Sequence, residues 1–131
     1  MEDNSGILAD TSVWIEFFRR ESETGAYLLS LLTEKPVWVC GIVMFELLQG
    51  VKSEAEKSEI QSALEGLPYA EMAPLLWEKA AELSRALKKS GLNIPLSDIF
   101  IASVAIEYNL SIFTLDKHFE QIPAVKLYIP S

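Results

Sequence analysis

Cysteine and histidine are nearly absent from this chain, which has one of each among its 131 residues. Cys40 lies in the apolar run 37–40, where we expect buried packing, and a single cysteine forms neither an internal disulfide nor a thiolate zinc site. His118 alone excludes a multi-histidine metal site and a ribonuclease that uses a histidine pair, and no serine–histidine nucleophile motif is present. A metal site in this chain therefore cannot be built from several histidines or cysteines, and acid–base work would fall to metal-bound water.

Long apolar runs are missing as well. Charged residues interrupt each hydrophobic stretch before it reaches the roughly 18 residues needed to span a bilayer. The first six residues are acidic and polar, whereas a secretory signal has a basic start followed by an apolar stretch. These patterns predict a soluble, cytoplasmic protein without a membrane partner.

Basic residues are outnumbered, with 11 Lys and Arg against 19 Asp and Glu and a formal charge of −8. This balance argues against a protein that grips nucleic acid through a broad basic face. The objection weakens if several carboxylates converge on divalent cations, because a bound cation inverts the local charge that a phosphate meets.

What the chain does contain is a hydrophobic half and a regular alternation of patterns, which predict one domain over residues 1–131. Helical periodicity is expected through 14–18, 22–32, 42–51, 53–64, 74–90 and 97–109. Strand patterns occur at 6–9, 37–40, 111–115 and 125–128, with a short edge strand within 67–72. The alternation predicts a three-layer α/β/α sandwich around a mostly parallel sheet of about five strands.

Four carboxylates stand out from this pattern, although each also has an ordinary explanation. Asp10 and Asp116 follow predicted strands, where the functional crevice of a parallel sheet lies, yet Asp10 is equally consistent with a helix cap and Asp116 with a turn. Asp98 falls in the first turn of a helix, where the helix dipole favours a negative charge. Glu46 has apolar neighbours on both sides, so it is either desolvated and partnered or on the surface.

Carboxylates gathered at one crevice repel one another unless protons or cations neutralise them. Oxygen ligands without a His or Cys cluster suit Mg²⁺ or Mn²⁺, and such ions activate water for phosphodiester hydrolysis. A receiver-like phosphoacceptor would need paired acids after the first strand, but Ala9 precedes Asp10. A haloacid-dehalogenase-like phosphatase would need a second acid two residues after the first, and that residue is Ser12.

Four segments, in this order and spacing, resemble the acidic motifs of the PIN-domain family, and within it the VapC-type toxins of bacterial and archaeal toxin–antitoxin pairs. The segments are ILADTSVWI at 7–15, MFELLQG at 44–50, IPLSDIFIA at 94–102 and TLDKHF at 114–119. The resemblance extends along nearly the whole chain. It implies a metal-dependent endoribonuclease.

By this resemblance Asp10, Glu46, Asp98 and Asp116 form the catalytic, metal-binding quartet. Asp10 and Asp98 are expected as direct ligands of Mg²⁺ or Mn²⁺, and Asp116 is expected to act through water. Hydroxyl groups of Thr114 and of Thr11 or Ser12 are expected to orient these carboxylates. The family further implies an RNA substrate, a homodimer, and a cognate antitoxin whose C-terminal tail lies in the active-site groove. The alternative is a catalytically weak or silent PIN-like module that acts mainly as a binding or regulatory partner.

Several other residues remain open. Trp14, Phe17, Phe18 and the stretch 28–32 supply either an apolar surface for a dimer or antitoxin, or ordinary core packing. Arg19, Arg20 and Lys117 are either phosphate or antitoxin contacts or solvated charges. His118 is assigned no catalytic role, because a lone histidine in such a turn is more often structural or exposed.

Overall fold

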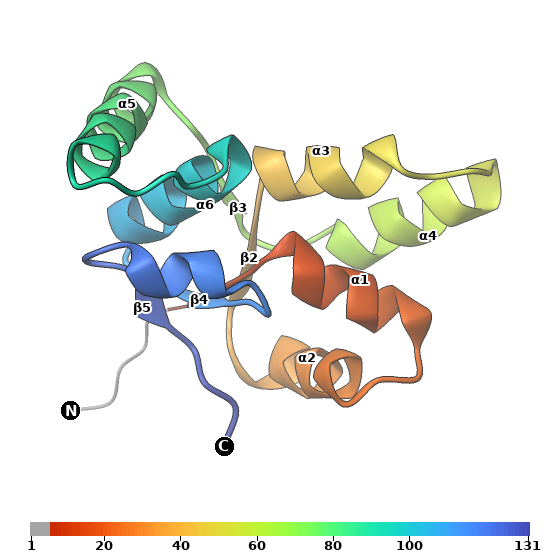
Figure 1. The fold of residues 1–131 in the computed structure, drawn as a ribbon. Coiled ribbons are helices and arrows are strands. Elements are labelled where there is room, and N and C mark those ends of the chain that lie inside the picture. The colour runs from red at the N-terminus through yellow and green to blue at the C-terminus, as the bar shows by residue number, and fades with distance from the viewer. Residues whose placement is uncertain (1–5) are drawn as a thin grey trace.

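Five strands form one sheet in a computed structural model that describes residues 6–131 (Figure 1). They are β1 (Ile7–Ala9), β2 (Val37–Cys40), β3 (Tyr69–Ala70), β4 (Ser111–Phe113) and β5 (Lys126–Leu127). Their order is β3-β2-β1-β4-β5, and each neighbouring pair is parallel. The predicted parallel sheet is confirmed, with the short strand β3 at one edge as expected.

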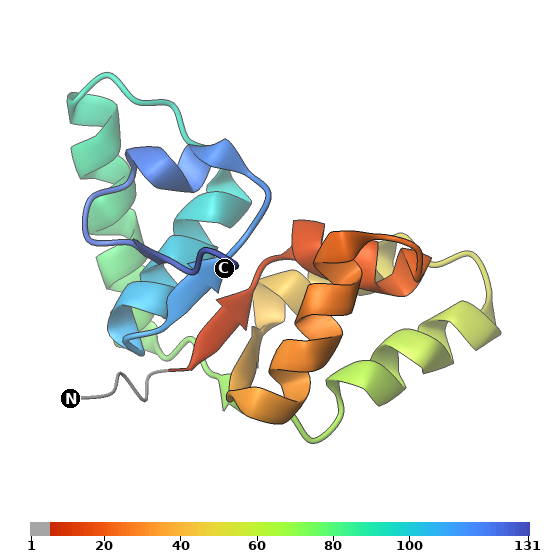
Figure 2. The ribbon, with the colours of Figure 1, turned by 90° about the horizontal axis from the view of Figure 1, so that it is seen from below.

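Six α-helices surround this sheet. They are α1 (Thr11–Arg19), α2 (Glu23–Glu34), α3 (Gly41–Gln49), α4 (Glu54–Leu64), α5 (Pro74–Lys89) and α6 (Leu96–Glu107). Seen from below, α1, α2 and α4 lie on one side of the strands, while α5 and α6 lie on the other (Figure 2). The three-layer α/β/α arrangement is therefore confirmed.

Burial explains why these segments pair as they do. Strand β1 is apolar throughout and buried along its length, as a central strand covered on both faces requires. Trp14 of α1 and Ile101 of α6 are fully buried on the helices that flank it. Serine caps begin α2 and α4, since Ser22 and Ser53 accept hydrogen bonds from the backbone of the following turn.

The chain first extends the sheet from β1 to β2 and β3 on one side, and then adds β4 and β5 on the other side of β1. The strand order therefore reverses between β1 and β4. In parallel sheets this switch point opens a crevice outside the carboxyl ends of the strands. Asp10 follows β1 directly, and Thr114 follows β4 directly. The topology thus brings together the first and last acidic segments of the sequence.

Two boundaries differ from expectation. Strand β4 ends at Phe113, not at 115, because its neighbour β1 ends at Ala9, opposite Phe113, and the chain then enters α1. Residues Lys117–Gln121 form a 3-10 helix, η1, where only a turn was expected. Asp116 caps this short helix by accepting a hydrogen bond from the backbone of His118, at 2.8 Å.

Among residues 6–131, no helix combines the length and the apolar character needed to cross a bilayer. The acidic, polar start of the chain lies outside the described residues except for Gly6.

Candidate metal centre

Asp10 is held at the end of β1 by side-chain hydroxyl groups. It is only 4% exposed, and its Oδ2 accepts hydrogen bonds from Thr114 Oγ1 at 2.7 Å and from Ser12 Oγ at 2.9 Å. Although Asp10 occupies the N-cap position of α1, its side chain makes no capping hydrogen bond. The cap explanation is therefore wrong, because the carboxylate is oriented into the crevice by two hydroxyl groups.

The same hydroxyl groups also fix the chain that leaves β4. Thr114 Oγ1 accepts a hydrogen bond from the backbone N–H of Asp116 at 2.9 Å, and Ser12 Oγ accepts one from Leu115 at 3.1 Å. The loop carrying Asp116 is thus tied to the residues that orient Asp10. Orientation of carboxylates by Ser12 and Thr114 was expected, and the geometry provides it for Asp10.

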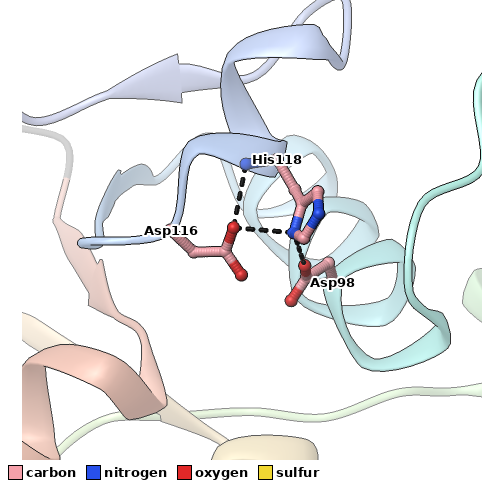
Figure 3. A group of neighbouring side chains, drawn as sticks. All are labelled: Asp98, Asp116 and His118. Atoms are coloured by element: carbon pink, nitrogen blue, oxygen red, sulfur yellow. Dashed lines mark hydrogen bonds and ion pairs between the residues drawn. The ribbon is translucent and has the colours of Figure 1, made fainter.

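Asp98, Asp116 and His118 form a second group beside this network (Figure 3). Asp98 projects from the first turn of α6, and its side chain is 9% exposed. Nδ1 of His118 lies 3.3 Å from Asp98 Oδ2 and 2.7 Å from Asp116 Oδ1. Within the described residues, Asp98 Oδ2 and His118 Nδ1 are nevertheless buried without a hydrogen-bond partner.

Burial, the negative charge of Asp116, a side-chain hydrogen bond with Asp116 and the charge of Asp10 together raise the pKa of Asp98 to about 7, and burial has the largest effect. Without a cation, the folded protein therefore favours the protonated form of this carboxyl group. A positive charge placed between these carboxylates would offset the repulsion from Asp116 and Asp10 and favour the charged form of Asp98. The raised pKa thus indicates that Asp98 lies where the folded chain provides too little positive charge to balance its carboxylate.

The donor set of this group fits a divalent cation. One ligand atom each from Asp98, Asp116 and His118 lies within 4.8 Å of the other two, and the Asp10 carboxylate is near enough to affect the charge of Asp98. Carboxylate oxygens are the ligands that Mg²⁺ and Mn²⁺ prefer. The unpartnered oxygen of Asp98 is the atom that such an ion would satisfy.

Glu46 is brought to the same crevice but not into that group of three. Its Oε1 accepts a 2.6 Å hydrogen bond from Thr11 Oγ1, the hydroxyl next to Asp10 in the chain. Helix α3 is less buried than its apolar sequence predicted, since Phe45 is 63% exposed and Glu46 is only partly covered. Of the two alternatives for Glu46, the structure thus shows neither fully: the side chain is partly covered, and it has a hydrogen-bond partner.

The residues proposed for an outer surface divide into core and groove. Trp14, Leu28 and Leu31 are buried in the core, whereas Leu29 is 59% exposed. Phe17 and Phe18 line a groove of about 420 Å³ between α1, α2 and α4.

The charged residues singled out from the sequence also divide. Arg19 forms an ion pair with Glu16, and Arg20 forms one with Glu59. Their charges are therefore partly neutralised within the chain. Lys117 is exposed. His118 was passed over from the sequence, because only the fold brings it to Asp98, twenty positions earlier in the chain.

These features define a class of protein: parallel α/β domains with a carboxylate centre at the topological switch point. Residues 7–125 match the family described as PIN domain. The chain belongs to the PIN domain family.

Relatives that resemble the chain along most of its length carry related names. It is 27% identical over 124 residues to a VapC ribonuclease of Mycobacterium bovis, covering 91% of this chain and 92% of that protein. It is 28% identical over 131 residues to ribonuclease VapC1 of Methanocaldococcus jannaschii, covering 98% and 89%. Among solved structures, VapBC2 from Rickettsia felis bound to a promoter DNA fragment superposes with a TM-score of 0.78 at 22% identity, covering 93% of this chain and 96% of that one.

Proposed function

We propose that this chain is a Mg²⁺- or Mn²⁺-dependent endoribonuclease that hydrolyses RNA phosphodiester bonds as the toxin of a VapBC-type toxin–antitoxin pair. One observation carries the proposal: a buried aspartate, Asp98, has an oxygen without a partner in an acidic crevice of a PIN fold. Relatives named VapC ribonuclease support the activity. The negative charge of the chain is compatible with RNA if cations occupy this crevice.

Each carboxylate has a distinct role in this proposal. Asp10 and Asp98 hold the cation directly, and Asp116 completes the site directly or through water. Ser12 and Thr114 orient Asp10, and Thr11 orients Glu46, through the hydrogen bonds described above. When bound, the cation supplies an activated water and stabilises charge on the phosphoryl group.

A cognate antitoxin and a second copy of the chain are the proposed protein partners, in the cytoplasm. Support comes from solved relatives described as VapBC, among them the Rickettsia felis complex. The apolar groove lined by Phe17 and Phe18 is a surface that a protein partner can cover.

The proposal is tested by incubating the purified protein with a defined RNA pool, with MgCl₂ or MnCl₂ or with EDTA, and mapping the cut sites. We expect discrete internal cuts that need the metal and are absent with EDTA. Intact RNA under every metal condition would leave the catalytically silent binding module as the better account.

A further inference from the structure

We propose that the cation site of this chain has a nitrogen ligand, Nδ1 of His118, in addition to the oxygens of Asp98 and Asp116. Such a site prefers Mn²⁺ or Co²⁺ to Mg²⁺ more strongly than carboxylates alone would. The inference rests on the proposed function in one respect, that the crevice holds a divalent cation. It goes beyond it by assigning a ligand and a metal preference.

The distances fit three atoms that share one ion. Two ligands about 2.1 Å from a cation and at right angles to each other lie about 3.0 Å apart. His118 Nδ1 lies 2.7 Å from Asp116 Oδ1 and 3.3 Å from Asp98 Oδ2, on either side of that separation (Figure 3). A small movement of the imidazole would make both separations equal.

These close contacts are not hydrogen bonds. Nδ1 of His118 and Oδ2 of Asp98 are both buried, and within the part of the chain described neither has a hydrogen-bond partner. The contact with Asp116, at 2.7 Å, is short enough for a hydrogen bond. Because it is not one, the angle between the imidazole and the carboxylate must be unsuitable. Ligands of a common ion have this geometry, because each points at the ion and not at the other ligand.

Asp98 supplies the independent sign of a missing ligand. Its side chain is more than nine-tenths buried, and its free oxygen faces the imidazole. A buried carboxylate oxygen without a hydrogen-bond partner is unfavourable, because it has lost its hydration and gained nothing in return. A cation between Asp98 and His118 would satisfy both orphaned atoms at once.

The local fold holds the imidazole in this position from its backbone. Asp116 Oδ1 accepts the backbone N–H of His118, which fixes the turn that begins η1. The next residue, Phe119, is 1% exposed and anchors that turn in the core. The position of His118 beside the first turn of α6 is therefore fixed by the structure of η1.

An imidazole ligand changes which ion binds best. Imidazole nitrogen favours transition metals, whereas carboxylate, carbonyl and water suit Mg²⁺. The chain adds one nitrogen to an otherwise oxygen-based set. We therefore expect Mn²⁺ and Co²⁺ to gain affinity from His118, and Mg²⁺ to gain little.

Calorimetric titration of the purified chain with MnCl₂, CoCl₂ and MgCl₂ tests this preference, and no histidine tag may remain. His118→Asn should weaken Mn²⁺ and Co²⁺ binding about 10-fold or more and Mg²⁺ binding by less than about 3-fold. Glu120→Gln is the matched control, because Glu120 is an exposed charge on the same short helix. Equal losses for all three ions, or no loss, would overturn the nitrogen ligand.

A spectroscopic measurement keeps the test valid if His118→Asn misfolds. His118 is the only histidine in the chain, so nitrogen coupling of imidazole type in the electron spin echo of bound Mn²⁺ reports this residue alone. We expect that coupling in the wild-type protein. Mn²⁺ bound without it would overturn the proposal.

The two proposals fail separately. RNA cleavage with no nitrogen coupling would leave the endoribonuclease standing and remove the histidine ligand. Nitrogen coupling without RNA cleavage would do the reverse.

Discussion

Two buried aspartates in the same crevice have opposite surroundings. Asp10 is 4% exposed and Asp98 6%, so burial does not distinguish them. Asp10 Oδ2 receives two hydroxyl hydrogen bonds, whereas Asp98 Oδ2 has none among the described residues. The protein thus satisfies one carboxylate itself and leaves the other to be satisfied by something it binds.

This difference suggests two roles: Asp10 is oriented by the protein itself, whereas Asp98 depends on a bound cation. Hydroxyl donors fix the direction of the Asp10 carboxylate before any ion binds. Asp98 instead carries an unfavourable environment into the folded state, with a pKa raised to about 7 by burial and by the charges of Asp116 and Asp10. A binding site can contain such a group, because a bound cation neutralises the carboxylate and stabilises the folded protein.

The largest effect expected is on RNA cleavage when either aspartate loses its charge. Asp98→Asn and Asp10→Asn should each lower the cleavage rate by about 10³-fold, because each removes a negative ligand from the cation. Gel analysis of a mapped substrate measures this loss. Glu65→Gln, at the exposed residue after α4, is the charge-matched control and should cut normally. Wild-type activity in Asp98→Asn would refute the assigned role.

A smaller effect is expected when Asp10 loses only its support. Thr114→Val removes the 2.7 Å hydrogen bond to Asp10 and the acceptor for the backbone of Asp116. Cation affinity and cleavage should fall about 10–100-fold. Thr33→Val is the control, since that exposed hydroxyl only donates to Ser30 in its own helix. If Thr114→Val binds Mn²⁺ as tightly as wild type, the hydroxyl network does not organise the site.

The smallest effect expected is on stability, and its sign is unusual. Because the pKa of Asp98 is raised in the fold, the folded protein binds more protons than the unfolded chain between about pH 4 and about 7. The contribution of this group to the free energy of unfolding therefore falls as pH rises through that window. Metal-free Asp98→Asn should lack this loss and be more stable than wild type at pH 7.5, by about 1–3 kcal/mol.

Thermal unfolding in EDTA across this pH range measures the difference between the two proteins. Asp10→Asn serves as the contrast, because it replaces an acceptor that already has two donors and should not be stabilised. A constant difference between wild type and Asp98→Asn at every pH would contradict the raised pKa.

Much of the fold could be predicted because its elements are local patterns. The strand Val37–Cys40 and the helices that begin near Ser22 and Ser53 appear as expected. The end of β4 could not be located, because it depends on where its neighbour β1 ends, far away in the sequence. Rules based on local residue propensity do not include contacts between residues far apart in the sequence.

The candidate site divides in the same way. Resemblance indicated the acidic residues, but it could not say that Glu46 pairs with Thr11 while Asp98 Oδ2 has no hydrogen-bond partner among the described residues. His118 was set aside because its relation to Asp98 exists only after η1 folds against α6.

The central claim is that Asp98 Oδ2 lacks a hydrogen-bond partner among the described residues because this atom binds a divalent cation. The most direct test is a carbon-13 NMR titration of the Asp98 carboxyl group, in EDTA and in saturating MgCl₂. The account predicts a midpoint near 7 without metal and a decrease of about 1–3 units or more with it. A midpoint near 4 in EDTA, unchanged by Mg²⁺, would contradict the account.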